Sequence, residues 1–271
     1  MELRCLALDL DRTTLDTNGR LAPQTRAALC YAMERGVTVI PASGRSFGTL
    51  PWEICRLPGI PYAITSNGAC VHALPTGAIL YRERLNPKCV AEIYRQTRVP
   101  GVFIEAFSRG VAYGEARYLR SMEDYGAHAG AIAYTRATRV PVQDMGRFIQ
   151  ENDLEALDVL CWEPEKTEAL RQTFSRLPDC YLTGSSPQRL EFSHPQTGKH
   201  RGAAWVLEQL GLEPKQLMAF GDGDNDAHLL QFAGLGIAVG NATPACLRAA
   251  DAVTDPNDCL GVANAIYHFI R

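Results

Sequence analysis

Residues 6–16 read Leu6-Ala7-Leu8-Asp9-Leu10-Asp11-Arg12-Thr13-Thr14-Leu15-Asp16. An apolar run ends there in two carboxylates one residue apart, which is typical of a buried strand whose C-terminal end carries chemistry. Side chains at i and i+2 share a face of a strand, so Asp9 and Asp11 would project together if the strand ran straight through both. Two such anions repel each other, and a divalent cation relieves that repulsion. The alternative interpretation is a helix N-cap or a turn, because Asp and Thr favour both positions.

The segments that follow repeat this arrangement of a strand with a polar end. Apolar residues at helical spacing predict a helix over residues 24–35, ended by Gly36. Strands are predicted at 37–40 and 62–65, and they run into Ser43-Gly44-Arg45 and Asn67 respectively. The β-α-β order predicts a parallel sheet with a right-handed crossover, so that three polar strand ends meet at one edge.

The pattern changes between about residue 83 and residue 188. We predict strands at 102–106, 111–114 and 156–162 and helices at 144–151 and 165–177, without polar residues at the strand ends. This mixture indicates an inserted α+β domain, with Gly184-Ser185-Ser186-Pro187 as a hinge back to the core. The predicted fold is therefore an α/β, Rossmann-like core formed by residues 1–83 and 189–271, with a second domain inserted at 84–188.

The core resumes with a strand at 189–193, after which Lys199 precedes a helix predicted over 201–210. A strand at 217–220 runs directly into Gly221-Asp222-Gly223-Asp224-Asn225-Asp226, the most acidic of the four strand ends. Two short apolar runs, at 237–239 and 252–254, predict further strands, and a last helix is predicted over 260–270.

Composition excludes several classes of partner. The 271 residues carry a net charge of -3 with scattered basic residues, which gives no footprint for nucleic acid or for an anionic membrane surface. The nine cysteines are odd in number and form no CxxC pair, so neither a zinc site nor a disulfide framework is indicated. We find no signal segment or membrane-spanning run and expect a cytoplasmic protein with reduced thiols.

If the polar strand ends converge, their side chains form a site that indicates a reaction. Ligands bind outside the carboxyl ends of strands in an open parallel sheet, so we expect Asp9, Asp11, Ser43, Asn67 and the Asp222/Asp226 pair to meet there. Carboxylates gathered at one edge favour Mg²⁺, which binds one or two of them together with water and a phosphate oxygen. One Asp can then attack phosphorus while the other moves a proton. Lys199 and Ser43 suit the charge on the transferring phosphoryl group.

These residues resemble, in order, the four motifs of the haloacid dehalogenase-like phosphohydrolases. The matching stretches are Asp9-Leu10-Asp11-Arg12-Thr13, Ala42-Ser43-Gly44-Arg45, Lys199 and Gly221-Asp222-Gly223-Asp224-Asn225-Asp226. Ser66-Asn67-Gly68-Ala69, Gly240-Asn241-Ala242 and a cap inserted between the second and third motifs are similar to the Cof-type subfamily, with its type IIB cap. The resemblance covers the chain outside the cap and implies a Rossmann-like core with an α+β cap.

The resemblance also implies roles for individual residues. Asp9 would be the nucleophile and a Mg²⁺ ligand, and Asp11 would be the general acid/base that also ligates Mg²⁺ through its carbonyl. Asp222 would be the third protein ligand, with Asp226 in or just outside the coordination shell. Phosphoryl oxygens would be held by Ser43 and Lys199. Further contacts to substrate or metal are implied for Asn225, and rim positions for Gly44, Arg45 and Asn67.

Arg12 departs from the family pattern, which usually has Gly at this position. If the turn required a positive φ, Arg would be strained by roughly 1 kcal/mol. Two interpretations remain open: a solvated or cap-facing Arg12, or a guanidinium directed at the substrate's phosphate or at a second anionic group.

The predicted function is a Mg²⁺-dependent phosphatase that hydrolyses a small phosphorylated metabolite, such as a sugar phosphate, through an aspartyl-phosphate. The alternatives are a phosphomutase of the same fold and a non-catalytic protein that binds phosphorylated metabolites. We expect a monomer or a homodimer without nucleic-acid or membrane partners.

Overall fold

The chain divides into two units in the computed structural model, which describes residues 2–127, 129–184 and 187–271. The first unit comprises Met1–Arg45, Leu50–Tyr81 and Gly198–Arg271. The second comprises Ser46–Thr49 and Arg82–Thr197. The first unit is therefore assembled from both ends of the chain, with the second inserted between them.

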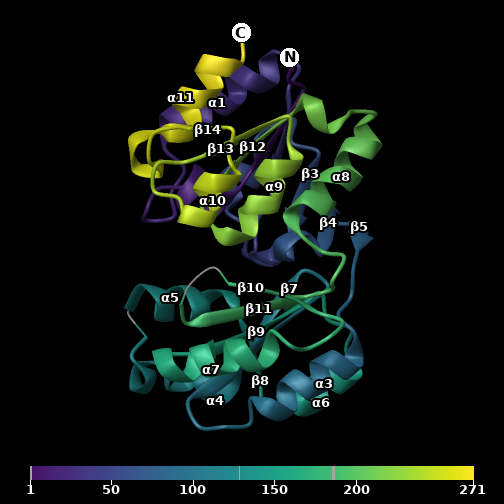
Figure 1. Ribbon diagram of the computed structural model, residues 1–271, viewed down its shortest axis with the longest axis vertical. Helices are drawn as coiled ribbons and strands as arrows, with labels where there is room; N and C mark the ends of the chain where they lie inside the picture. Colours follow the sequence, from purple (N-terminus) through teal and green to yellow (C-terminus); the bar gives the residue numbers. More distant parts are fainter. Residues whose placement is uncertain (1, 128, 185–186) are drawn as a thin grey trace. The chain divides into compact units, whose positions relative to one another are not determined.

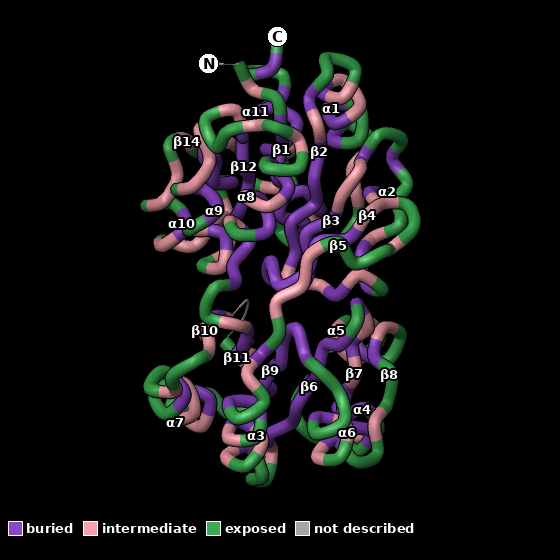
Figure 2. The backbone as a smooth tube through the Cα atoms, turned by 90° about the vertical axis from the view of Figure 1, so that its right-hand side faces the viewer, coloured by how far each residue is buried: buried purple, intermediate pink, exposed green. Residues whose placement is uncertain are grey.

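A five-stranded sheet forms the centre of the first unit, in the order β14-β13-β12-β1-β2 (Figure 1). Its strands are β1 (Cys5–Leu8), β2 (Thr38–Pro41), β12 (Leu217–Gly221), β13 (Leu235–Ala238) and β14 (Ala252–Val253). Every neighbouring pair is parallel. β1 lies between β12 and β2 and is buried along its whole length (Figure 2). The predicted parallel α/β core is confirmed.

Helices cover both faces of this sheet. α1 (Pro23–Glu34) and α11 (Gly261–Phe269) pack against each other on one face, while α8 (Lys199–Leu210), α9 (Ala227–Phe232) and α10 (Pro244–Ala249) cover the other. Cys5 and Ala7 of β1 pack with the second group of helices, so the alternating Leu6 and Leu8 face the first. Within the described residues, no helix is both long and apolar enough to cross a membrane.

The strand predicted at 62–65 is present as β3 (Tyr62–Thr65), but its main partner is antiparallel. It pairs with β4 (Cys70–Ala73) in a three-stranded sheet completed by β5 (Ile79–Arg82). The turn at Ser66–Gly68 reverses the chain directly after β3 and allows this pairing. A parallel bridge between Ala42 and Ile64 still aligns β3 with the end of β2. A short helix, α2 (Trp52–Cys55), precedes β3.

The second unit is built on a six-stranded sheet in the order β10-β11-β9-β6-β7-β8. Its strands are β6 (Val102–Ser108), β7 (Val111–Glu115), β8 (Val140–Val142), β9 (Ala156–Cys161), β10 (Tyr181–Thr183) and β11 (Arg189–Ser193). Its helices are α3 (Pro87–Gln96), α4 (Ala116–Arg120), α5 (Ala129–Thr138), α6 (Met145–Glu151) and α7 (Pro164–Phe174). Alternate residues of β6, β9 and β11 share one apolar core with α3, α6 and α7. A mixed α+β unit at this place in the chain is what the sequence predicted.

The return to the core comes later than residue 189. Arg189–Ser193 forms β11, which pairs antiparallel with β9 and with β10 in the second unit, and the first unit resumes at Gly198. Local sequence does not distinguish this strand from a strand of the first unit, because both kinds of strand carry buried apolar residues such as Leu190 and Phe192. Of the predicted hinge, Ser185 and Ser186 lie outside the described residues. The two strands beside it, β10 and β11, belong to the same sheet.

Buried charges cross the three central strands of the second unit. Glu105, Asp158 and Glu191 stand in register on β6, β9 and β11, and all three are buried. Arg189 donates hydrogen bonds to Asp158 and Glu105, and Arg139 donates to Glu105 at 2.8 Å. Burial raises the pKa of Asp158 to about 8, against the attraction of Arg189. This row is an acid-rich ion cluster inside the unit.

Candidate active site

The carboxyl ends of β1 and β12 bring Asp9 and Asp222 together. The two strands pair in parallel with Leu8 opposite Phe220, and the Asp9 N–H donates to the Phe220 carbonyl at 3.1 Å. Asp222 follows Gly221, the last residue of β12. Parallel neighbours end at the same edge of the sheet, so the two carboxylates meet although most of the chain separates them.

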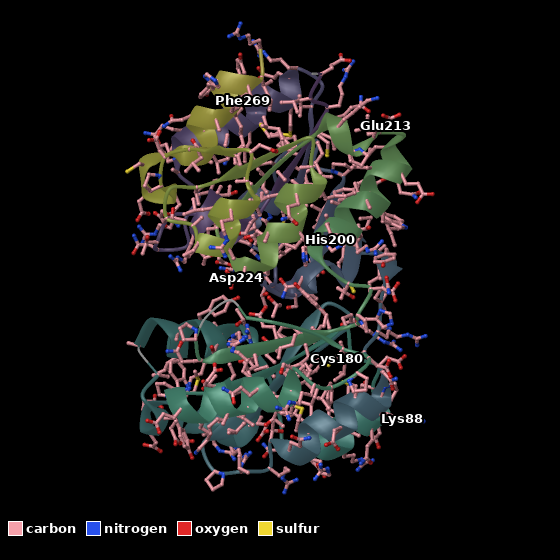
Figure 3. The ribbon with its side chains drawn as sticks, viewed as in Figure 1. Lys88, Cys180, His200, Glu213, Asp224 and Phe269 are labelled. Carbon is pink, nitrogen blue, oxygen red and sulfur yellow. The ribbon has the colours of Figure 1, made fainter. Side chains whose placement is uncertain are left out.

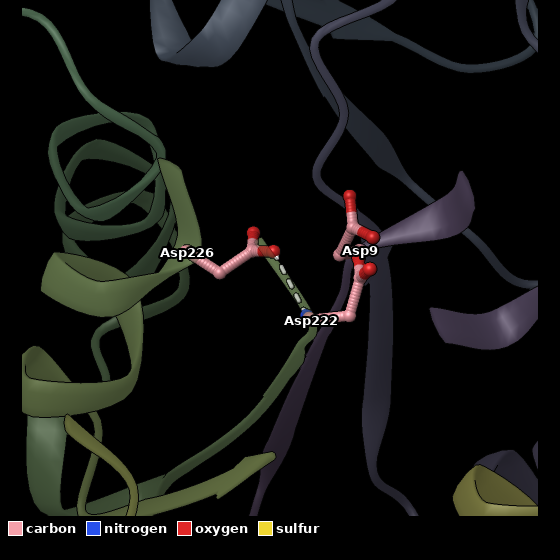
Figure 4. A group of neighbouring side chains, drawn as sticks. All are labelled: Asp9, Asp222 and Asp226. Atoms are coloured by element: carbon pink, nitrogen blue, oxygen red, sulfur yellow. Dashed lines mark hydrogen bonds between the residues drawn. The ribbon is translucent and has the colours of Figure 1, made fainter. Parts of the chain in front are cut away.

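Asp226 completes a cluster of three buried carboxylates (Figure 4). Asp9, Asp222 and Asp226 each offer an oxygen, and these oxygens lie within 4.8 Å of one another. Asp226 Oδ2 accepts hydrogen bonds from the N–H groups of Asp222 at 3.0 Å and Gly223 at 2.9 Å. Gly221 makes room for this arrangement, because a Cβ there would lie 2.3 Å from the Cβ of Asp226.

Lys199 is the cation of this cluster. It is the first residue of α8, and its Nζ lies 2.6 Å from Asp9 Oδ1 and 2.6 Å from Asp226 Oδ1. Burial alone would lower the pKa of Lys199, but attraction to Asp226 and Asp9 outweighs burial and raises it. Glycine permits the close approach of the chain that starts α8, since a Cβ on Gly68 would lie 2.1 Å from the Gly198 carbonyl oxygen.

Three carboxylates around one lysine leave an excess of negative charge. Burial, followed by repulsion from Asp226, raises the pKa of Asp9 well above its usual range. The same two causes raise the pKa of Asp222 to about 6, against the attraction of Arg12. Hard oxygen donors in this arrangement suit a divalent cation, which would compensate the charge. The residues present therefore fit a metal ion.

Asp11 is not part of this carboxylate cluster. β1 ends at Leu8, and Leu10–Thr14 curls into a helical turn closed by a hydrogen bond from the Leu15 N–H to the Leu10 carbonyl at 2.9 Å. The strand therefore does not run straight through Asp9 and Asp11, and the condition for a shared strand face is not met. The Asp11 side chain is 49% exposed, and its two oxygens accept hydrogen bonds from Arg45 Nε at 2.8 Å and Arg45 Nη2 at 2.5 Å.

The loop that carries Asp11 is held by residues whose roles the sequence did not indicate. Thr13 Oγ1 donates to Asp222 Oδ1 at 3.1 Å. Asn241 Nδ2 donates to the Arg12 carbonyl at 2.9 Å, and Asn241 Oδ1 accepts from the N–H of Asn257 at 2.9 Å. Asn241 and Thr13 each belong to a motif of the resemblance, but neither was given a role, and Asn257 lies outside the motifs. Asp224 lies between Asp222 and Asp226 in the sequence and is exposed (Figure 3). It accepts a hydrogen bond from Thr243 Oγ1 at 2.7 Å.

Ser43, Asn67 and Asn225 form a linked group. The buried Ser43 receives the Asn67 N–H on its carbonyl at 3.1 Å and the Arg45 N–H on its Oγ at 3.1 Å. Asn225 Nδ2 donates to Asn67 Oδ1 at 3.0 Å. Gly44 lies against Asn67, because a Cβ on Gly44 would be 3.1 Å from Asn67 Oδ1. The predicted phosphate-binding residues other than Lys199 are thus connected to one another through hydrogen bonds and close contact.

Known proteins are similar to this chain along almost its whole length. A family model for haloacid dehalogenase-like hydrolases matches residues 6–266. The chain is 26% identical over 287 residues to phosphatase YwpJ of Bacillus subtilis (strain 168), covering 99% of this chain and 100% of that protein. It is 26% identical over 271 residues to a phosphoglycolate phosphatase of Methanothermobacter thermautotrophicus, with 99% of each protein covered.

The fold agrees with a solved structure. A haloacid dehalogenase-like hydrolase from B. subtilis superposes with a TM-score of 0.86 at 25% identity, over 99% of this chain and 100% of that one. The predicted family relationship is confirmed by these matches together with the motif residues at the carboxyl edge of the sheet. The chain belongs to the haloacid dehalogenase-like hydrolase family, and within it to the Cof-type phosphatases that its motifs indicated.

Proposed function

We propose that the chain hydrolyses the phosphate ester of a small metabolite, such as a sugar phosphate, with Asp9 as the nucleophile. The observation that carries this proposal is the environment of the Asp9 carboxylate: its burial and its contacts. It is buried beside Asp222 and Asp226, and the protonated Lys199 holds its Oδ1 at 2.6 Å. A carboxylate held by a cation next to a metal-binding group is suited to attack phosphorus.

The proposed reaction has two steps. An Asp9 oxygen forms a bond to phosphorus as the bond from phosphorus to the ester oxygen breaks, and that oxygen takes a proton from Asp11. Water then attacks the aspartyl-phosphate and gives a proton to Asp11, which releases inorganic phosphate and restores Asp9. Because Asp11 is paired with Arg45 in this structure, its side chain must leave that guanidinium to reach the ester oxygen.

Other residues of the site would hold the phosphoryl group. The Ser43 hydroxyl and the Lys199 ammonium are the donors that we assign to its oxygens, with Gly44, Asn67 and Asn225 beside them. Asp9, Asp222 and the Asp11 carbonyl would bind Mg²⁺, with Asp226 within or next to that set. When bound, Mg²⁺ supplies positive charge against the phosphoryl oxygens.

The test is phosphate release from a panel of phosphorylated metabolites with Mg²⁺, comparing the wild type with Asp9→Asn. We expect release from one or more small phosphate esters, abolished by EDTA and reduced at least about 10³-fold in Asp9→Asn. Circular dichroism of Asp9→Asn checks that the variant folds. Activity retained in a folded Asp9→Asn, or no release from any ester in the panel, would contradict the proposal.

The proposed substrate class indicates the partners and the cellular location of the chain. Small phosphorylated metabolites are the partners that we assign to this chain, and we propose that it meets them in the cytoplasm. A monomeric or homodimeric state stays a prediction.

A further inference from the structure

Arg12 has a backbone conformation that is unfavourable for its side chain. Its φ is 61° and its ψ is 9°, in the left-handed region where glycine and asparagine are the residues most easily accommodated. The Asn241 side chain holds the loop there by donating to the Arg12 carbonyl at 2.9 Å. Backbone strain that is kept beside a cluster of carboxylates points to a function of the Arg12 side chain, and its contacts indicate which.

The Arg12 side chain pairs with the one carboxylate of the cluster that Lys199 does not contact in the described ion pairs. Lys199 lies 2.6 Å from oxygens of Asp9 and of Asp226. Asp222 instead has the Thr13 hydroxyl at 3.1 Å from Oδ1 and Arg12 Nε at 3.7 Å from Oδ2. Lys199 therefore pairs with Asp9 and Asp226, and Arg12 pairs with Asp222.

The contact between Arg12 and Asp222 is loose and open to solvent. The Arg12 side chain is 63% exposed and that of Asp222 is 11% exposed. Among the described residues, the Arg12 guanidinium has this one long ion pair, so it can move away from the carboxylate at little cost. Binding of a metal ion to Asp222 would nevertheless break this ion pair and would place the metal near the positive charge of Arg12. Both effects disfavour binding of the metal.

We propose that Arg12 is a built-in counter-cation that competes with the divalent metal for Asp222 and thereby weakens metal binding to the site. The inference rests on the metal site of the proposed function. Arg12 keeps the charge of the carboxylate group partly compensated when no metal is bound, and its removal makes the site more attractive to Mg²⁺. Repulsion near a solvent-exposed side chain is screened by salt, so the effect must weaken as ionic strength rises.

The test is calorimetric titration of the full chain with MgCl₂ alone, at about 0.05 M and about 0.5 M KCl. Arg12→Asn removes the charge and tolerates the left-handed backbone, whereas Arg12→Lys keeps a charge. We expect Arg12→Asn to bind Mg²⁺ roughly threefold to tenfold more tightly than wild type at low salt and less than about twofold at high salt. Arg12→Lys should stay within about twofold of wild type at both.

Arg4→Gln is the matched control. Arg4 directly precedes β1, at the end of that strand opposite Asp9, and its side chain is also exposed. The substitution changes the net charge by the same amount, so it should leave Mg²⁺ affinity within about twofold of wild type. Equal tightening in Arg4→Gln and Arg12→Asn would show an effect of net charge and would overturn the proposal.

Asp222→Asn separates this inference from the proposed metal site. Loss of Mg²⁺ binding in Asp222→Asn with unchanged or weaker binding in Arg12→Asn overturns the role of Arg12 and leaves the metal site standing. Mg²⁺ binding to Asp222→Asn at wild-type affinity overturns both. Tighter binding in Arg12→Asn, lost in the double variant with Asp222→Asn, is the result that supports the competition.

Discussion

Lys199 keeps two carboxylates together in a region with little access to water. Asp9 and Asp226 each place an oxygen 2.6 Å from its Nζ, and the three side chains are buried. A charge in such a place is stable only while its partner is present, since water cannot replace that partner. Lys199 is therefore a structural requirement of the cluster as well as a proposed ligand of phosphate.

Replacing Lys199 by Met should lower the free energy of unfolding by about 3–5 kcal/mol in metal-free buffer, because Asp9 and Asp226 lose their buried cation. Urea unfolding in EDTA at pH 7 measures this change. Lys215→Met is the control, since Lys215 pairs with Glu213 at an exposed position and should cost less than about 0.5 kcal/mol. Equal losses in the two variants would show that Lys199 does not stabilise the cluster.

At the scale of elements, two distant loops fix the turn that follows β1. Asn241 holds the Arg12 carbonyl, and Asn257 binds both Asn241 and the carbonyl of Leu15. Two of these side chain to backbone contacts join segments more than 200 residues apart: Asn241 is 229 residues from Arg12, and Asn257 is 242 residues from Leu15. The turn carrying Asp11 and Thr13 therefore depends on the loop after β13.

Asn241→Ala should lower the free energy of unfolding by about 1–2 kcal/mol, because it leaves the Arg12 carbonyl and the Asn257 N–H without this partner. Phosphate release should fall by about tenfold or more as the turn loses its position. Asn152→Ala serves as the control, since Asn152 is exposed and donates to the Phe148 carbonyl in the second unit. If Asn241→Ala matched this control in both measurements, the loop would not depend on Asn241.

The ion cluster of the second unit gives a separate prediction. The pKa of Asp158 in the folded chain, about 8, is above its ordinary value of 3.8, so the folded state holds a proton that the unfolded state releases. This contribution to stability is complete below about pH 4 and is lost as pH rises through 8. Asp158→Asn should therefore change the melting temperature little at pH 4, raise it at pH 6 and raise it further at pH 9. Exposed Asp153→Asn is the control, and a pH-independent effect of Asp158→Asn would contradict the assignment.

The sequence predicted those elements whose signals are local. Apolar runs with polar ends marked β1, β2 and β12. The motifs indicated that Asp9, Asp222 and Asp226 would gather at their edge, but Asp11, which was expected with them, pairs with Arg45 instead. The membership of β11 depends on register with β9, where Leu190 lies opposite Val159, and no local feature of residues 189–193 carries that information. Likewise, Arg12 could be identified as unusual, but its contact with Asp222 depends on a turn that the strand pattern did not reveal.

At the scale of the whole molecule, stability should depend on pH and on metal together. The pKa of Asp222 is raised to about 6 from 3.8, and that of Asp9 is also raised, so protonation stabilises the metal-free fold. The part due to Asp222 is complete below about pH 4 and is lost as pH rises through 6. A metal needs the deprotonated carboxylates, so its stabilisation grows over the same range.

Melting temperatures with EDTA and with Mg²⁺ at pH 5 and pH 8 test this coupling. We expect a larger increase in melting temperature from Mg²⁺ at pH 8. In EDTA the melting temperature should fall from pH 5 to pH 8, and this fall should be smaller in Asp222→Asn by the equivalent of about 1.4 kcal/mol. Protonation of Asp158 gives a pH dependence of stability with the same sign. It is present in the wild type and in Asp222→Asn, so it cancels when the two are compared. An Mg²⁺ effect that is larger at pH 5 would contradict the proposed site.

The position of β1 between β2 and β12 also constrains the order in which the chain can fold during synthesis. β2 follows β1 closely, but Asp222 is made 209 residues after Thr13, which means about 10–40 s later at ordinary rates of translation. All strands of the second unit are complete before β12 exists. A nascent chain can therefore finish its inserted unit while one side of β1 is still unpaired, and the carboxylate cluster forms only when the last quarter of the chain emerges.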